Sequence, residues 1–175
     1  AIAKIAGIKM CESYNIQYKT NYNCLMPTNT FGPNDNYHPL NSHFFPALIK
    51  KCHEIKKKNK DQLILWGNGK ALREVIYVDD LADACIFFMK KKIKEPIINI
   101  GTGKDFSIKT YAEKILKEII PKKKILIKYD YSKPNGTPRK ILDITLAKSY
   151  GWRPKTSLKD AIRKTYKDFL SKKEK

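Results

Sequence analysis

The segment Gly101-Thr102-Gly103 follows a short apolar run and is the part of this chain that most resembles a phosphate-binding loop. Backbone N–H groups of such a loop can surround a phosphate at the start of a helix. The segment lacks the third glycine of the dinucleotide fingerprint and the acidic residue expected downstream of it. The pattern therefore favours a plain strand-to-helix turn, and the chain has no recognisable phosphate site of its own.

Thiols are the other reactive groups, and they are scattered. The cysteines are Cys11, Cys24, Cys52 and Cys85, without a Cys-x-x-Cys pair and without a closely spaced histidine. Zinc sites need such spacing. The sequence therefore predicts free thiols in a reducing compartment and no metal site.

Basic residues outnumber acidic ones by 36 to 17, which gives a formal net charge of +19. A charge of this size raises nucleic acid as a partner. The excess is mostly lysine in runs typical of solvated faces, so we expect no nucleic-acid partner, although a nucleotide diphosphate would benefit from the positive field. No apolar run of about 18 residues and no signal-peptide pattern occurs, so we also expect no membrane association and a cytoplasmic location.

The elements that would position functional groups follow from periodicity and capping signals. We expect helices over residues 1–18, 45–58, 79–92, 108–120 and 158–170, and strands over 22–26, 63–66, 75–78, 97–100 and 125–129. Ser107 should cap the fourth helix, and the strand over 22–26 should be a buried strand of a parallel sheet that leads into a ligand-holding loop over 27–41. The alternation predicts an α/β fold. The first helix has no start signal, which suggests a chain cut inside an element.

Several segments resemble known dehydrogenases. Residues 1–7 resemble the segment that follows the catalytic tyrosine in the Tyr-x-x-x-Lys motif of short-chain dehydrogenases, with Lys4 as the motif lysine. Residues four apart share a helix face, so an ammonium at this place can lower the pKa of the phenol and bind the nicotinamide ribose. Further segments resemble the GDP-L-fucose synthase family of extended short-chain dehydrogenases in that family's order: residues 26–35, 41–48, 66–69, 73–74, 78–80, 99–103, 133–140 and 151–152.

The resemblance implies the C-terminal half of an NAD(P)-binding Rossmann-like enzyme. Residues 1–33 would complete the dinucleotide-binding domain, and residues 34–175 would form mainly the smaller mixed α/β nucleotide-sugar domain, with some segments returning to the Rossmann sheet. The glycine-rich loop, the catalytic serine and tyrosine and a partner cysteine would lie upstream of this sequence. We therefore expect the isolated chain to be inactive and the complete protein to be a homodimer.

The implied reaction converts GDP-4-keto-6-deoxy-D-mannose to GDP-L-fucose, by epimerisation at C3 and C5 and then NADPH-dependent reduction at C4. The resemblance gives catalytic roles to Lys4 and His43, whose imidazole suits an acid because its ordinary pKa is about 6.5. Cofactor contacts would come from Lys4, Pro27, Thr28, Asn29, Thr30 and His43. Without the flanking match, His43 would more often be a histidine that only satisfies a loop.

Cations and an aromatic surface would hold the GDP-sugar. The implied substrate residues are Lys51, Trp66, Arg73, Asn135 and, more weakly, Lys140. A buried core residue is the equal alternative for Trp66. The family usually has Asp at the place of Asn135 and often Arg at the place of Lys51, which puts nucleotide selectivity and affinity in doubt.

Three alternatives remain open from the residues. The chain could belong to another extended dehydrogenase acting on a different nucleotide sugar, it could be a basic binding module, or it could be a non-catalytic remnant that needs a second chain to complete its sheet.

Overall fold

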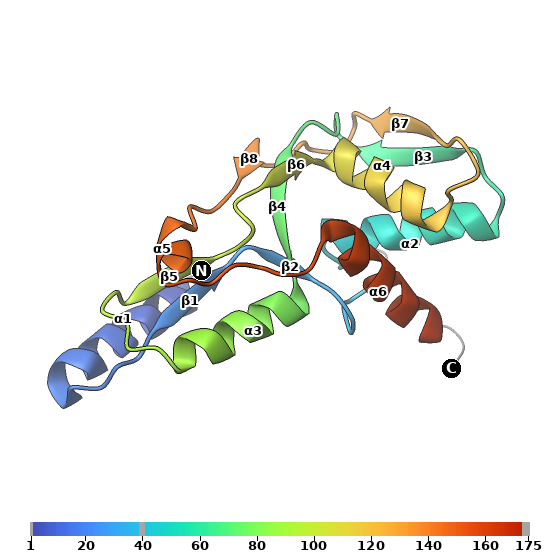
Figure 1. Cartoon of the computed structure of the whole chain (residues 1–175). Helices are drawn as coiled ribbons and strands as arrows, with labels where there is room; N and C mark the ends of the chain where they lie inside the picture. Colours follow the sequence, from blue (N-terminus) through green and yellow to red (C-terminus); the bar gives the residue numbers. More distant parts are fainter. Residues whose placement is uncertain (1, 39–40, 173–175) are drawn as a thin grey trace.

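The computed structural model describes residues 2–38 and 41–172 and has a mixed α/β architecture. The helices are α1 (Ile2–Tyr18), α2 (Phe44–Lys57), α3 (Val78–Met89), α4 (Ile108–Ile119), α5 (Thr145–Ser149) and α6 (Leu158–Ser171). The strands are β1 (Cys24–Pro27), β2 (Asn29–Phe31), β3 (Gln62–Trp66), β4 (Leu72–Tyr77), β5 (Ile97–Ile100), β6 (Asp105–Ser107), β7 (Leu126–Asp130) and β8 (Arg139–Lys140). Figure 1 shows an elongated molecule with α1 at one end and β3, β7, α2 and α4 at the other.

Strands far apart in the sequence pair in three small sheets, all of which contain parallel pairs. β1 lies parallel to β5, and β3 lies parallel to β7. β4 is central to the third sheet, where it pairs with β2 and β8 in parallel and with β6 in antiparallel orientation. Parallel pairs require crossover connections, so the prediction of an α/β fold from alternating elements is confirmed.

β4 separates two hydrophobic cores. Val75 and Tyr77 point into a larger core, whereas Ile76, which lies between them, points into a smaller one. Successive side chains of a strand face opposite sides, so a single strand can belong to both cores. The smaller core also contains Phe88 from α3 and Trp152 from the segment after α5.

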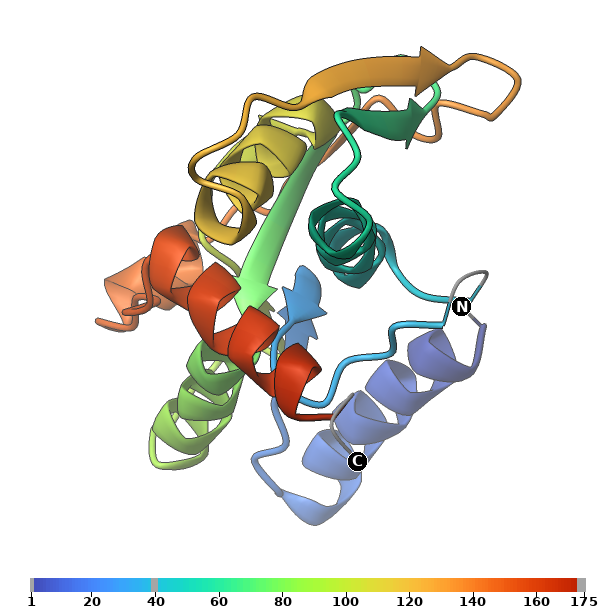
Figure 2. The ribbon, with the colours of Figure 1, turned by 90° about the vertical axis from the view of Figure 1, so that its right-hand side faces the viewer.

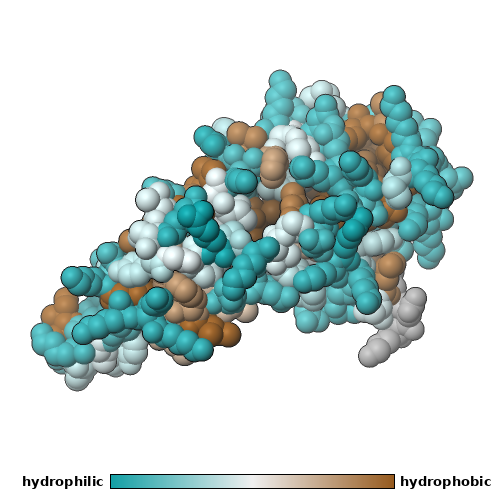
Figure 3. Space-filling model, in the orientation of Figure 1, coloured by the Kyte–Doolittle hydropathy of each residue, from teal (hydrophilic) through white to brown (hydrophobic). Residues whose placement is uncertain are grey.

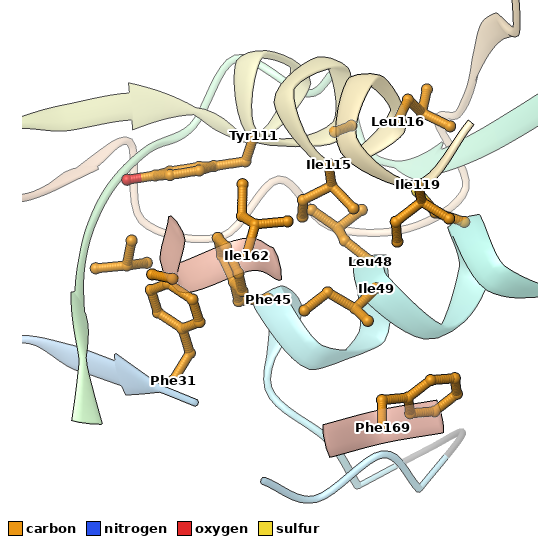
Figure 4. Packing of buried hydrophobic residues seen from close by; sticks show 14 of the residues in the cluster. Phe31, Phe45, Leu48, Ile49, Tyr111, Ile115, Leu116, Ile119, Ile162 and Phe169 are labelled. Carbon is orange, nitrogen blue, oxygen red and sulfur yellow. The ribbon is translucent and has the colours of Figure 1, made fainter. Parts of the chain in front are cut away.

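The larger core is formed by α2, α4 and α6 together with β2, β3 and β4 (Figure 4). Phe31 and Phe45 meet at its centre with ring centroids 3.9 Å apart, and Tyr111 packs against Phe45 at 5.6 Å. Burial of each such side chain contributes about 1.5–3 kcal/mol relative to exposure. Ser107 caps α4 by accepting a hydrogen bond from the Thr110 backbone N–H at 3.0 Å, as predicted.

The end that contains α1 and β1 is packed differently. The predicted helix is present, but none of its described residues is buried, and in Figure 2 α1 lies apart from the layers around β4. The prediction of a buried strand is wrong for β1, whose residues are half-buried or exposed. Within the described residues β1 pairs only with β5, so its second edge has no strand beside it.

Four short elements were not predicted from sequence: β2, β6, β8 and α5. Each has five residues or fewer, too short for a periodic pattern. None of the described helices has both the length and the apolar character needed to cross a membrane. The division of the chain into domains after residue 33 stays a prediction.

Candidate functional site

A hollow of about 270 Å³ lies between α2, β3, β4 and the segment before β8. Its lining contains Lys51, Trp66, Arg73 and Asn135, four of the five residues expected from sequence to hold a substrate. The remaining lining residues are Ser42, Phe44, Ala47, Leu48, Leu65, Ile108 and Pro134. The lining thus combines apolar side chains with basic and polar ones, a composition suited to a ligand with a flat ring and an anionic group.

The Trp66 side chain is 55% exposed, so the alternative of a core tryptophan is wrong. The cause is the alternation along β3, where Leu63 and Leu65 are buried and Trp66 falls on the opposite face. Two ammonium groups lie over the indole, Lys51 Nζ at 5.4 Å and Lys133 Nζ at 5.7 Å from the ring centroid. An indole with cations close to its ring offers a rigid apolar surface beside positive charge.

The Lys51 ammonium is held in place from two sides. Its Nζ donates a hydrogen bond to the Ile64 carbonyl at 3.1 Å while it lies near the Trp66 ring. Partial burial lowers the pKa of Lys51, and the nearby Cys52 and Asp130 act in the opposite direction. The side chain is therefore fixed at the rim of the hollow instead of extending freely into solvent.

Arg73 connects β4 to the segment before β8. Its Nη1 donates to the Leu72 carbonyl at 2.7 Å and to the Thr137 carbonyl at 2.6 Å. Within the described residues, Nε and Nη2 of Arg73 donate no hydrogen bond, so these two groups can bind an anion. A guanidinium whose plane is fixed in this way is prepared for bidentate binding of a phosphate.

Asn135 is held by the turn after β3. Its Oδ1 accepts a hydrogen bond from the Asn68 backbone N–H at 2.7 Å. The turn leaves no space for a larger residue at Gly67, which has a left-handed φ of 64° and where a Cβ atom would lie 2.4 Å from the same Oδ1. The acceptor that Asn135 retains is therefore used within the protein, and this contact fixes the loop on which Pro134 lines the hollow.

A second hollow, of about 580 Å³, contains the expected cofactor residues Pro27, Thr28 and Asn29 together with Arg139 and Lys140. Lys140 lines this second hollow, although on β8 it is paired with Arg73 of β4, which lines the first one. The Thr28 Oγ1 and the Asn29 Nδ2 both donate to the Glu74 carbonyl, at 3.2 Å and 3.0 Å. The loop is anchored on β4 by these bonds, and Thr30, also expected from sequence, continues it as part of β2.

Glu74 links this loop to the Gly101–Gly103 segment. Its side chain is fully buried, and Oε1 accepts hydrogen bonds from the backbone N–H groups of Thr102 at 2.6 Å and Gly103 at 2.7 Å. Oε2 accepts from the Leu142 N–H at 2.8 Å. The amides that resembled a phosphate loop therefore bind an internal carboxylate, and the prediction that this segment holds no phosphate of its own is consistent with their occupation.

His43 lies at the N-cap position of α2, is exposed, and has no side-chain capping hydrogen bond. Its neighbours in sequence, Ser42 and Phe44, both line the smaller hollow. Asp35 faces it: burial raises the pKa of the Asp35 carboxyl, and the backbone N–H of Asn36 and the charge of His43 lower it. Asp35 Oδ2 is buried without a hydrogen-bond partner. A carboxylate beside the expected acid was missed by the sequence analysis.

Lys4 is exposed on α1 and is not among the residues that line either hollow. The structure therefore does not bring it to the other expected site residues in this chain. All four cysteines are free thiols, as predicted. Within the described part of the chain, no group of three or more His, Cys, Asp or Glu side chains has a geometry that could hold a metal ion.

A family model described as the NAD dependent epimerase/dehydratase family matches residues 1–101. The chain belongs to this NAD-dependent epimerase/dehydratase family. The Rossmann-like fold class expected from sequence is thereby confirmed. The matched residues contain Lys4, His43, Lys51, Trp66 and Arg73, whereas Asn135 and Lys140 lie beyond them.

Individual proteins of known name are similar to nearly the whole chain. A putative GDP-L-fucose synthase 2 of Arabidopsis thaliana is 48% identical over 97% of this chain and 51% of its own length. The GDP-L-fucose synthase of Escherichia coli K12 is 45% identical over 97% of this chain and 55% of its own length. The chain thus spans about half the length of the curated relatives it matches.

A solved structure shows the same arrangement of elements. It is MlghC, a GDP-mannoheptose C4 reductase from Campylobacter jejuni with NADP bound, and it is 31% identical with a TM-score of 0.80. The similarity covers 97% of this chain and 59% of that one.

Three residues with a place in the site were not proposed from sequence. Lys133 and Asp35 stood inside matched segments but had no local pattern that marked them. Glu74 also stood inside a matched segment, next to Arg73. An acidic residue directly before the predicted strand over 75–78 was its only local signal, because its hydrogen-bond partners lie 28 and 68 residues away.

Proposed function

We propose that this chain is the nucleotide-sugar half of a GDP-L-fucose synthase. The complete protein would convert GDP-4-keto-6-deoxy-D-mannose to GDP-L-fucose through 3,5-epimerisation and reduction of the 4-ketone. The observation that carries this proposal is the convergence of Lys51, Trp66, Arg73 and Asn135 on one hollow of about 270 Å³, although they are up to 84 positions apart in sequence (135 minus 51). The two curated relatives described above support the choice of GDP-L-fucose synthase.

Each side chain has a role that its chemistry supports. Trp66 would pack against the guanine or the sugar, because its indole is exposed and flanked by ammonium groups. Arg73 and Lys51 would neutralise the diphosphate, since both cations are oriented by bonds to backbone carbonyls. A fixed cation loses less conformational entropy when an anion binds, which favours affinity.

His43 would donate and accept protons beside the ketone. The carbons C3 and C5 flank this group and carry its most acidic hydrogens, so an imidazole near neutrality can complete the exchange. Exposure of His43 between two residues of the hollow supports access to a bound sugar. Lys4 would bind the ribose of the nicotinamide, a role that needs sequence beyond these 175 residues.

The residues of the second hollow fit one end of NADPH. They combine hydroxyl and amide side chains, which donate to the Glu74 carbonyl, with the Lys140 cation. Arg139 also lines this hollow, but its guanidinium binds the Asp105 carboxylate. NADPH, when bound, would supply the hydride for reduction at C4. The amides of the Gly101–Gly103 segment are already bonded to Glu74, so a pyrophosphate would need a loop from the other half of the enzyme.

Binding of GDP to the isolated chain tests the proposal directly. The chain has two tryptophans, and Trp152 is buried with its Nε1 bonded to Asp83, so a change in fluorescence on adding GDP reports mainly on Trp66. We expect saturable quenching by GDP and weaker quenching by UDP. Arg73→Ala should weaken GDP binding by about tenfold or more, which corresponds to about 1.4 kcal/mol.

Lys90→Ala is the matched control, since Lys90 ends α3 outside both hollows and should leave GDP affinity unchanged. Equal affinity for UDP and GDP would favour a different nucleotide sugar. Insensitivity to Arg73→Ala would contradict the proposed site. The isolated chain, mixed with NADPH and the keto sugar, should form no GDP-L-fucose, and product formation would contradict that part of the proposal.

A further inference from the structure

Cys11 on α1 and Cys24 at the start of β1 lie against each other. The pKa of the Cys24 thiol is raised, first by burial and then by its interaction with the Cys11 thiol. Both residues are partly exposed, whereas Cys52 is buried in the larger core and Cys85 is exposed on α3. The chain therefore contains one pair of neighbouring thiols at its surface.

The local geometry explains why these two thiols meet. After α1 ends at Tyr18, the chain reverses through Lys19, whose φ of 56° is left-handed, and returns along the helix into β1. Asn15 fixes this return, because its side chain donates to the Tyr22 carbonyl at 2.9 Å and accepts from the Tyr22 N–H at 2.8 Å.

Cys11 is four residues before Asn15, and Cys24 is two residues after Tyr22. Four residues of helix advance about 6 Å, and two residues of extended chain advance about 6.6 Å. The two segments run in opposite directions, so the contact between Asn15 and Tyr22 places Cys11 opposite Cys24. Residues at these spacings also share a face of the helix and of the strand.

We propose that Cys11 and Cys24 are a redox-sensitive dithiol that closes into an intrachain disulfide when it meets a small-molecule disulfide of the glutathione class. This modification site is independent of the proposed function, and it joins α1 to β1 covalently. The two elements carry Lys4 and lead into Pro27, so oxidation fixes the helix of the expected ribose ligand against the expected cofactor loop.

The reaction balances by thiol–disulfide exchange. The Cys11 thiolate attacks one sulfur of the small disulfide, which releases one thiolate and leaves a mixed disulfide on Cys11. Cys24 then loses its proton and attacks the Cys11 sulfur, which releases the second thiolate. Two protein thiols are oxidised, one small disulfide is reduced to two thiols, and the two protons from the protein end on those leaving groups.

Cys11 is the attacking residue in this order because the raised pKa of Cys24 keeps that thiol protonated to higher pH. Deprotonation of Cys24 is needed only in the second step, where the neighbouring mixed disulfide makes the reaction intramolecular.

Peptide mapping of the whole chain tests the proposal. The reduced chain is incubated with oxidised glutathione at mildly alkaline pH, remaining thiols are blocked at acid pH, and the chain is digested with trypsin without a reductant. Cleavage after Lys19 separates the two cysteines onto peptides 10–19 and 20–50. We expect these peptides to be linked, with a mass about 2 Da below their sum because two hydrogens are lost.

When the chain is unfolded before blocking, so that the buried Cys52 also reacts, the number of thiols that can be blocked should fall from four to two, and dithiothreitol should restore all four. Non-reducing electrophoresis should show a monomer, which establishes that the bond is within one chain. Hydrogen exchange of the α1 amides should slow by about threefold or more in the oxidised monomer, because local opening of the helix is restricted.

Cys85→Ser is the matched control and should keep the linked peptides, whereas Cys11→Ser should abolish them and leave Cys24 blocked or glutathionylated. Mapping of the unsubstituted chain does not depend on whether either variant folds. Separate glutathione adducts on Cys11 and Cys24, links to Cys85, or dimers joined through these residues would overturn the proposal.

Discussion

The two ends of this molecule differ in how they bury apolar side chains. At one end, α2, α4 and α6 enclose Phe31, Phe45 and Tyr111 almost completely, and the hollow with Trp66 opens on the side of this core. At the other end, Ile2, Ile5 and Met10 of α1 are 83%, 59% and 61% exposed. Figure 3 shows apolar side chains at the surface of both ends, among a largely hydrophilic exterior. The first end buries its apolar side chains against one another, whereas the second leaves apolar side chains at the surface, as is typical of contact sites for another segment.

The largest effect should come from the larger core. Phe45→Ala should lower the free energy of unfolding by about 3–5 kcal/mol, because it removes a ring that packs against both Phe31 and Tyr111. Urea denaturation followed by circular dichroism measures this change. Tyr131→Ala is the control, since this ring is 75% exposed and its loss should change stability by no more than about 0.5 kcal/mol. Similar losses for the two variants would mean that the core around Phe45 is not the stabilising unit.

The buried carboxylate between the two ends should come next. Glu74→Gln should cost about 2–3 kcal/mol, because an amide nitrogen would face backbone N–H donors that now bind a charged oxygen. The same denaturation experiment applies, with Glu113→Gln as a control for loss of an exposed charge, whose ion pair with Lys109 is long at 3.8 Å. An unchanged free energy of unfolding in the Glu74→Gln variant would show that the segment after β5 does not depend on the carboxylate.

A smaller and pH-dependent effect is expected at Asp105. A hydrogen bond from Arg139, with Nε 2.6 Å from Oδ2, lowers the pKa of this carboxyl. A lowered folded-state pKa gives stability that is fully present above the unfolded value of about 3.9 and is lost as the pH falls through the folded value. The stability gap between the wild type and Asp105→Asn should therefore be constant above about pH 5 and close in more acidic solution. A gap that persists or widens in acid would assign the effect to something other than the ion pair.

The smallest effect is expected on α1. Ile5→Ser should change the free energy of unfolding of this chain by no more than about 0.5 kcal/mol, because the side chain is 59% exposed and buries little apolar surface when the chain folds. It should also reduce self-association, which light scattering measures at increasing concentration. A loss of more than about 1 kcal/mol would indicate that α1 buries this residue in solution, and the contrast between the two ends would then disappear.

Local signals predicted the long elements well. Ser107 ahead of an apolar periodic run identified α4 and its cap, and the run before Trp66 identified β3. The region 27–41 was read as loop because of its Pro, Asn and Gly content, yet residues 29–31 pair with β4. Such pairing depends on a partner 46 residues away, and no local pattern of three residues can report it.

The site was predictable in its residue types and less so in its geometry. The alternation of Leu63 and Leu65 with Trp66 already implied an exposed indole, and this part of the sequence could have decided between a core residue and a ligand surface. Lys140 lies beside Arg73 and yet lines a different hollow, which depends on the path of β8 along β4 and is a tertiary feature. The same applies to Asp35 and Lys133, whose positions follow from packing and not from spacing.

Glu74 has a consequence for how glycine-containing turns are interpreted in general. The chain carries its own anion to a nest of backbone amides, so any incoming phosphate would have to displace a like charge that is tethered and shielded from water. Because the Glu74 carboxylate binds the amides of this turn, it holds three segments that are distant in sequence together, and it prevents dissolved anions from binding there. An alanine at position 74 would leave the Thr102 and Gly103 amides without an anion, and inorganic phosphate should then stabilise the substituted chain more than the unsubstituted one.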